Sequence, residues 1–201
     1  MAAYGVVWSL GDVPLDVAQR QALMTYVETG GILVLDGSTA RAFSAHFTGV
    51  RVADGFMHDP RIQSALQELP PLTDPYQHRP MAIVRDAYPI AWSGQGQPLL
   101  VWKPVGKGMV IVSGLDHWLD ERGQILPLTG LLLQRLESAF VPFSVAGEVE
   151  RFISRTSDGW VIGLINNHGV RKSPTLRETV DPSEARSCMI RLHKGAPKSF
   201  S

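Results

Sequence analysis

Three aspartates, Asp12, Asp36 and Asp116, each stand just after a short apolar run of the chain. If these runs are parallel strands of one sheet, their carboxyl ends meet at one edge, which is where such sheets bind ligands. Asp120 follows Asp116 by four residues, a spacing that puts two side chains on the same face of a helix. Carboxylate oxygens are the ligands that Ca²⁺ and Mg²⁺ prefer. The four aspartates are therefore a candidate site for calcium or magnesium.

The same edge offers groups for acid–base chemistry. His117 directly follows Asp116, so an imidazole that titrates near neutral pH stands next to a carboxylate. With a metal ion polarising a carbonyl group and activating water, Asp36, Asp116 and His117 would be the catalytic residues of a hydrolase. Suitable substrates would be small esters, lactones such as acyl-homoserine lactones, or glycosides.

These residues also fit structural roles. Asp12 or Asp16 can cap a helix, and Asp36 can form a turn. Asp116 can cap a helix over residues 117–121. Under this interpretation the acidic residues shape the ends of elements and take no part in chemistry.

Other reactive side chains give weaker signals. Ser38 is a possible nucleophile at a strand end, but its surroundings are not G-x-S-x-G, and a helix-capping role fits it better. The single cysteine, Cys188, excludes an intrachain disulfide framework and a paired-cysteine zinc site, and we expect a half-buried thiol. No two histidines have the spacing of a zinc site. Four tryptophans would stack on sugar rings if exposed, although tryptophans in strands usually belong to the core: Trp92, Trp102, Trp118 and Trp160.

The composition excludes several classes of protein. Nineteen basic and nineteen acidic side chains balance over 201 residues, and 44% of the residues are hydrophobic, which is typical of a globular protein. Without an excess of positive charge, we expect no binding of nucleic acid or of a membrane surface through a basic face. No apolar run approaches the roughly 18 residues of a membrane span, and no signal-peptide pattern is visible. We expect a soluble, cytoplasmic protein.

The N-terminal part predicts a strand, a helix and a second strand. Apolar runs at residues 4–8 and 32–35 are typical of buried strands. Between them, residues 14–29 predict a helix in which Asp16 and Gln19 have the spacing of a capping box. A glycine pair ends this helix. A helical connection joins parallel strands, so we expect a βαβ unit within a parallel sheet.

The middle of the chain mixes helix and strand signals. Residues 99–102 and 109–112 flank a glycine-rich connection, which predicts a hairpin. Residues 125–140 carry leucines around most of a helical circumference, which predicts a largely buried helix. Further expected elements are short helices at 39–47 and 59–69, a loop at 71–80, and strands at 81–85 and 90–92.

The pattern changes at Pro142. Beyond it, side-chain alternation and turn signals replace long helices. Residues 148–156 and 160–166 predict another hairpin. We expect an α/β domain over residues 1–142 and a small β-sandwich-like unit over residues 143–201.

Three segments carry a resemblance to a known family: YVETGGILV at 26–34, GKGMVIV at 106–112 and DGWVIGLINN at 158–167. Together they resemble class I glutamine-amidotransferase-like domains, of the kind found as trimerisation or accessory domains in family 42 β-galactosidases and related glycoside hydrolases. The resemblance implies a flavodoxin-like, mostly parallel sheet with helices on both faces, followed by a small antiparallel β unit. It also implies N-terminal truncation, because such domains usually carry further β/α units before the first strand.

The sequence departs from this family where the chemistry would be. An active glutamine amidotransferase needs a cysteine nucleophile at a sharp turn between a strand and a helix. The corresponding turn at residues 35–39 reads Leu-Asp-Gly-Ser-Thr and has no cysteine. The favoured hypothesis is a non-catalytic accessory or oligomerisation module that self-associates or belongs to a larger glycoside hydrolase. The alternative is the hydrolase described above, with a small carbonyl compound or a sugar as its ligand.

Overall fold

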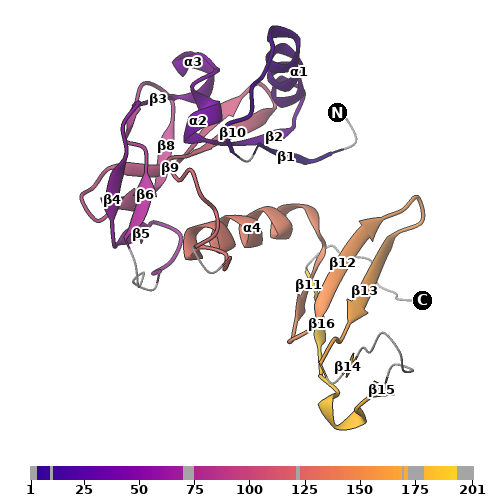
Figure 1. Cartoon of the computed structure of the whole chain (residues 1–201). Helices are drawn as coiled ribbons and strands as arrows, with labels where there is room; N and C mark the ends of the chain where they lie inside the picture. Colours follow the sequence, from indigo (N-terminus) through magenta and orange to yellow (C-terminus); the bar gives the residue numbers. More distant parts are fainter. Residues whose placement is uncertain are drawn as a thin grey trace. The chain divides into compact units, whose positions relative to one another are not determined.

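The computed structural model describes residues 4–9, 11–69, 75–120, 123–168, 170–171 and 179–193. The chain divides into two compact units, Met1–Leu136 and Glu137–Ser201; Figure 1 colours them along the sequence. The predicted domain boundary after residue 142 stays a prediction. No helix in the described ranges is long and apolar enough to cross a membrane.

A six-stranded sheet organises the first unit (Figure 1), with the strand order β1-β2-β10-β9-β8-β5. The strands are β1 (Val6–Ser9), β2 (Ile32–Asp36), β5 (Ile62–Ser64), β8 (Tyr88–Ser93), β9 (Pro98–Val105) and β10 (Gly108–Ser113). β2 pairs in parallel with β1 and with β10. The pairings β10–β9, β9–β8 and β8–β5 are antiparallel. The sheet is therefore mixed, and the prediction of a mostly parallel sheet is wrong.

The hairpin of β9 and β10 explains this difference. Only Gly106 and Lys107 separate the two strands, and so short a connection joins antiparallel strands. Gly106 has φ 58°, and a Cβ atom there would lie 2.7 Å from the carbonyl oxygen of Glu28. Both the turn and this close approach therefore require glycine. The hairpin itself is confirmed as predicted.

The predicted βαβ unit is also confirmed, with helix α1 (Val17–Glu28) between β1 and β2. Asp16 is the N-cap: its carboxylate accepts a hydrogen bond from the Gln19 amide at 2.7 Å. In return, the Gln19 side chain accepts one from the Asp16 amide at 2.9 Å. This reciprocal pair is the capping box that the sequence predicts.

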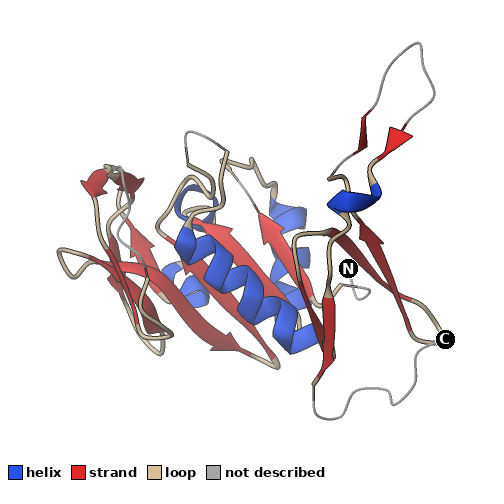
Figure 2. Cartoon of the chain, turned by 90° about the horizontal axis from the view of Figure 1, so that it is seen from below, coloured by secondary structure: helices blue, strands red, loops and turns tan. Residues whose placement is uncertain are grey.

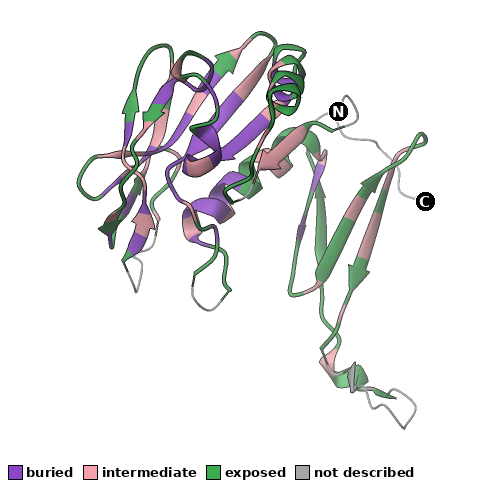
Figure 3. Cartoon of the chain, turned by 45° about the horizontal axis from the view of Figure 1, so that its top comes forward, coloured by how far each residue is buried: buried purple, intermediate pink, exposed green. Residues whose placement is uncertain are grey.

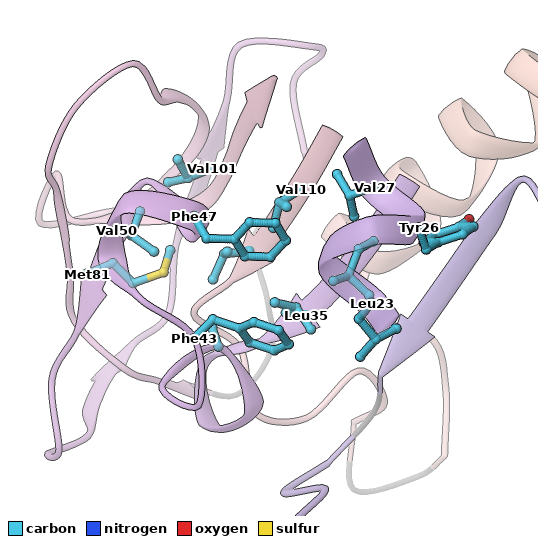
Figure 4. Close-up of a cluster of buried hydrophobic side chains, with 13 residues drawn as sticks. Leu23, Tyr26, Val27, Leu35, Phe43, Phe47, Val50, Met81, Val101 and Val110 are labelled. Atoms are coloured by element: carbon cyan, nitrogen blue, oxygen red, sulfur yellow. The ribbon is translucent and has the colours of Figure 1, made fainter. Parts of the chain in front are cut away.

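Two hydrophobic clusters cover opposite faces of the sheet. Leu33 and Leu35 of β2 belong to the first cluster and Val34 to the second, because successive residues of a strand point to opposite faces. Helices α1, α2 (Gly37–Ala40) and α3 (Ala45–Thr48) cover the first face, and α4 (Pro127–Phe140) covers the second (Figure 2). Figure 4 shows the first cluster, in which the stacked rings of Phe43 and Phe47 lie near Leu35.

Two predictions for residues 59–80 are wrong. No helix begins at Asp59, which ends strand β4 (Met57–Asp59). Its carboxylate accepts hydrogen bonds from the amides of Arg61 at 2.9 Å and Gln95 at 3.1 Å, so it stabilises a turn, and β5 then pairs with β8. In the predicted loop, Tyr76–His78 forms strand β6, which pairs with β4; residues 71–74 lie outside the described ranges.

Smaller differences concern the neighbouring elements. The single helix predicted at 39–47 is two short helices, α2 and α3. The strand predicted at 81–85 is β7 (Met81–Ile83), which pairs with β3 (Val50–Val52). The leucine-rich helix α4 forms, but the prediction that it is largely buried is wrong. It buries Leu128, Leu131 and Leu132 on one face, and its side chains at 133–135 and 138–140 are exposed.

The second unit consists of small antiparallel sheets, as predicted. Its elements are β11 (Phe143–Ala146) paired with β16 (Met189–Leu192), β12 (Glu150–Arg155) paired with β13 (Trp160–Ile165), β14 (Val170–Arg171) paired with β15 (Thr179–Val180), and a 3₁₀ turn at Pro182–Glu184. Most described side chains of β12, β13 and β16 are exposed (Figure 3). Cys188 is exposed as well, so the prediction of a half-buried thiol is wrong.

Candidate functional site

The carboxyl ends of β1, β2 and β10 meet at one edge of the sheet, as the sequence analysis expected. The register pairs Ser9 with Leu35 and Ser113 with Asp36, so the three strands end nearly level. The segments that leave these ends carry most of the predicted site residues. We call this region the carboxyl edge.

Asp36 lies fully buried at the end of β2. One carboxylate oxygen, Oδ1, accepts a hydrogen bond from the Thr39 amide at 2.7 Å, so Asp36 is the N-cap of α2. The other, Oδ2, has no hydrogen-bond partner among the described residues. Burial raises the pKa of Asp36 above its ordinary value, and the nearby charge of Asp116 adds to this rise. Capping is thus the role that the geometry gives to this residue.

Asp116 is engaged through both carboxylate oxygens. Arg79 Nε lies 2.7 Å from Oδ2 and forms an ion pair with it, and the Ser38 hydroxyl donates a hydrogen bond to Oδ1 at 3.3 Å. The Arg79 guanidinium also donates to the Asp54 carbonyl at 2.9 Å and lies 4.0 Å from the centre of the Phe56 ring. Charge-assisted hydrogen bonds of this kind hold both partners in fixed positions. The charge of the carboxylate is therefore balanced within the protein.

Two close contacts complete the network at the carboxyl edge. The Thr39 hydroxyl donates a hydrogen bond to the Gly11 carbonyl at 2.6 Å, which fastens the loop after β1 to helix α2. A Cβ atom on Gly37 would lie 3.1 Å from Arg79 Cδ and 3.4 Å from Asp116 Oδ1. The chain after β2 thus passes close enough to the ion pair to favour glycine at this position.

The other predicted site residues do not join this network. Asp12 and His117 are exposed. The Asp120 carboxylate accepts a hydrogen bond from the Gln124 amide at 2.7 Å, in a turn where Gly123 has φ 74°. The helix expected over residues 117–121 is absent from the described residues 117–120. The prediction that Asp116 and Asp120 share one helix face is therefore wrong, because Asp120 belongs to a turn.

The described residues of the carboxyl edge bring two of the predicted metal ligands together. Among the described residues, no group of three or more histidine, cysteine, aspartate or glutamate side chains is placed to hold a metal ion. Of the four predicted ligands, the structure brings together Asp36 and Asp116, and Arg79 supplies the positive charge beside Asp116. The expected arrangement of four carboxylates around calcium or magnesium is therefore not formed in the described part of the chain.

Arg79 is the residue that the sequence analysis missed. It lies 37 positions before Asp116, in a stretch predicted to be a loop. A local sequence pattern cannot predict a contact between residues so far apart. The pairing of β6 with the segment after β10 brings these two residues together. The Arg79 amide donates to the Gly114 carbonyl at 2.8 Å, and an isolated bridge joins His78 to Leu115.

The tryptophans do not form an open platform for a sugar. Trp118 is buried and lies edge-on to Trp8, with ring centres 4.6 Å apart. Trp102 is half-buried and stacks on Tyr88. Trp92 and Trp160 are half-buried as well. Packing against neighbouring residues accounts for these side chains, as expected for tryptophans in strands.

Comparison with known proteins gives similarities of fold. No family model and no curated protein sequence matches this chain. Among solved structures, a β-galactosidase from Bacillus circulans sp. alkalophilus has a TM-score of 0.62 and 12% identity, and the match covers 96% of this chain and 32% of that one. The E323A mutant of Gan42B, a GH42 β-galactosidase from G. stearothermophilus, has a TM-score of 0.58 and 13% identity, with coverage of 96% and 31%.

The chain therefore has the fold of one part of GH42 β-galactosidase chains and spans about a third of their length. A structure described as the mmIFT52 N-terminal domain also matches, with a TM-score of 0.50, 13% identity, and coverage of 70% of this chain and 80% of that one. The fold thus occurs in proteins with different descriptions. A fold alone does not determine a function, and the finer resemblance to glutamine-amidotransferase-like domains stays a prediction.

Proposed function

We propose that the chain is a non-catalytic accessory module of a protein related to glycoside hydrolases. The observation that carries this proposal is the closed network of Ser38, Arg79 and Asp116 at the carboxyl edge. These three side chains stand where this architecture places its chemistry, and they are bonded to one another.

The chemistry of a serine nucleophile makes this argument specific. Ser38 needs a base that removes its proton, and the acceptor of its hydrogen bond is Asp116. The Arg79 guanidinium already binds the other oxygen of that carboxylate, so Asp116 is held in place as the partner of an ion pair. The Thr39 amide, which could stabilise an oxyanion, already donates to Asp36. These contacts support a structural role for the network.

The alternative, a hydrolase of small esters, lactones or glycosides, has one supporting observation. Asp36 carries a carboxylate oxygen with no partner among the described residues and a raised pKa, which are features of functional carboxyl groups. Its side chain is, however, completely buried. A substrate would therefore reach Asp36 only after a rearrangement of the carboxyl edge.

The fold comparison supports the accessory role. The β-galactosidase chains that share this fold are about three times as long as the aligned part, so there the fold is one component of a larger protein. We propose the same arrangement here, with other parts of a larger chain or a second copy of the module as the partner. In the described sheet β1 pairs only with β2, and a free strand edge is a common surface for association.

Turnover measurements test the proposal. Purified wild-type chain, Ser38→Ala and Asp116→Asn would be incubated with an aryl galactoside, an aryl ester, a homoserine lactone and glutamine, each with and without Ca²⁺, Mg²⁺ or a chelator. Ser154→Ala, which changes an exposed serine of β12, is the matched control. We expect all four proteins to equal the buffer blank. Turnover that disappears in Ser38→Ala or Asp116→Asn but persists in Ser154→Ala would overturn the proposal.

Association is tested by sedimentation velocity over a wide range of protein concentrations. For a module that assembles with copies of itself, the mean sedimentation coefficient should rise with concentration. A monomer at every concentration would contradict the self-association part of the proposal.

A further inference from the structure

The side chain of His78 is a buried imidazole ring. It is the last residue of β6 and is 1% exposed. Neither Nδ1 nor Nε2 has a partner among the described residues. A buried polar group without partners is uncommon because it has lost its bonds to water. This position suits a neutral imidazole and opposes a charged one.

The charged groups around His78 that the structure describes are engaged with other partners or exposed. From β4, the acidic Asp59 and the exposed His58 face it, and the oxygens of Asp59 already accept the amides of two turn residues. From β6 itself, the Tyr76 ring lies 5.5 Å away. From the segment after β10, Asp116 is paired with Arg79. The described carboxylates near His78 thus already have other partners.

His78 also lies where β6 contacts the segment that follows β10 at the carboxyl edge. It forms the isolated bridge with Leu115, and the next residue, Arg79, donates its amide to Gly114. The same Arg79 side chain forms the ion pair with Asp116. If β6 moved away from the segment after β10, the backbone contacts of His78 and Arg79 with that segment would break. The ion pair of Arg79 with Asp116 would break with them.

We propose that His78 is a pH-sensitive latch, whose protonation separates β6 from the Gly114–Asp116 segment and opens the carboxyl edge. The latch is closed while the ring is neutral. When β6 moves away, the imidazole reaches water and can accept a proton. Acidic conditions therefore favour the open form, in which the ion pair of Arg79 with Asp116 is broken.

The linkage between protonation and opening sets the direction and size of the effect. Burial lowers the pKa of His78, while the Arg79 backbone and the Asp59 charge oppose this to a lesser extent. The open form binds the proton more tightly, so the closed form loses stability as the pH falls below the ordinary histidine value of about 6.5. Between about pH 7.5 and about pH 5.5, the opening equilibrium constant should rise, by at most about tenfold.

Amide hydrogen exchange measured by NMR at these two pH values tests the latch. The reporter is the Arg79 amide, which is bonded to Gly114, with rates corrected for intrinsic exchange. In the wild type, protection should fall on acidification, by at most about tenfold. In His78→Phe, which has no titrating ring, it should stay constant. His46→Gln, which changes an exposed histidine of α3, is the matched control and should behave as the wild type.

Two results would overturn the latch: equal protection of the Arg79 amide at both pH values, or the same loss in His78→Phe as in the wild type. If His78→Phe does not fold, a titration of the His78 ring protons in the wild type decides the question. A titration midpoint below the ordinary histidine value supports the latch, and a midpoint at or above it excludes the latch. The result does not depend on whether the carboxyl edge is catalytic.

Discussion

Replacing Arg79 by methionine measures how much the network at the carboxyl edge contributes to stability. The side chains of Arg79 and Asp116 are 11% and 12% exposed, and Arg79 Nε lies 2.7 Å from Asp116 Oδ2. Arg79→Met keeps an aliphatic stem but leaves the Asp116 carboxylate, among the described residues, with the Ser38 hydrogen bond alone. Removing one partner of a buried ion pair costs about 3–5 kcal/mol, because the other charge stays buried and unpaired. Since both side chains keep some contact with water, we expect a loss of about 3 kcal/mol.

A double-mutant cycle isolates the pair from other effects of the substitutions. Arg79→Met, Asp116→Leu and the double variant would be unfolded in urea, with tryptophan fluorescence as the signal. The double variant should be more stable than the sum of the single losses predicts, with a coupling of about 2 kcal/mol. Arg41→Met is the control because Asp54, the partner of Arg41, is 86% exposed. This substitution should lower the free energy of unfolding by less than about 0.5 kcal/mol. A coupling between Arg79 and Asp116 no larger than this value would refute the reasoning.

Three further substitutions test separate parts of the structure by urea unfolding. Because burial raises the pKa of Asp36, the folded chain holds this proton more tightly than the unfolded chain, and stability is lost as the pH rises through the folded pKa. Asp36→Asn keeps a capping side chain, so it should gain stability relative to the wild type between about pH 4.5 and about pH 7.5; an unchanged difference would contradict this. Gly108→Ala should cost more than about 2 kcal/mol, because its Cβ would lie 2.1 Å from the Gly31 carbonyl oxygen, whereas Gly55→Ala, with open space around its Cβ, should be nearly neutral. Asp16→Ala removes the capping box of α1 and should cost about 1 kcal/mol; an unchanged stability would mean that the cap contributes nothing.

Local signals predict the N-terminal half of the sheet well. The capping box at Asp16 and the short glycine turn at Gly106 each involve residues within a few positions of one another. Such signals identify one helix and one hairpin, and the parallel pairing of β1 with β2 then follows from the helical connection. The position of Asp36 and Asp116 at one edge follows from the same reasoning.

The wrong predictions of secondary structure occur where a local sequence pattern is compatible with two structures. Asp59 followed by Pro60 can start a helix or form a turn, and the distant partner of the Asp59 carboxylate, the Gln95 amide, favours the turn. Asp116 and Asp120 have helical spacing, yet Asp120 bonds to Gln124 in a turn. In each case a contact that the local spacing does not show decides between the two structures.

The pairing of Asp116 with Arg79 shows why the role of the candidate site residues could not be predicted from the sequence. An acidic residue after a strand end is compatible with a metal ligand, a helix cap or an ion pair. The choice depends on which group the fold brings beside it. Here the residue after β6, in a stretch predicted to be a loop, brings a guanidinium beside Asp116, so the ion pair is the role that the described contacts of Asp116 show.

The reactivity of Ser38 tests the central claim, that the carboxyl edge is a closed network and not a catalytic centre. The wild-type chain and Ser38→Ala would be treated with a fluorophosphonate, which modifies activated serine hydroxyls, and their intact masses measured. The structure predicts an unchanged mass for both proteins, because the hydroxyl of Ser38 donates to a carboxylate whose charge Arg79 balances. A single adduct on the wild type that maps to Ser38 and is missing from Ser38→Ala would contradict the account.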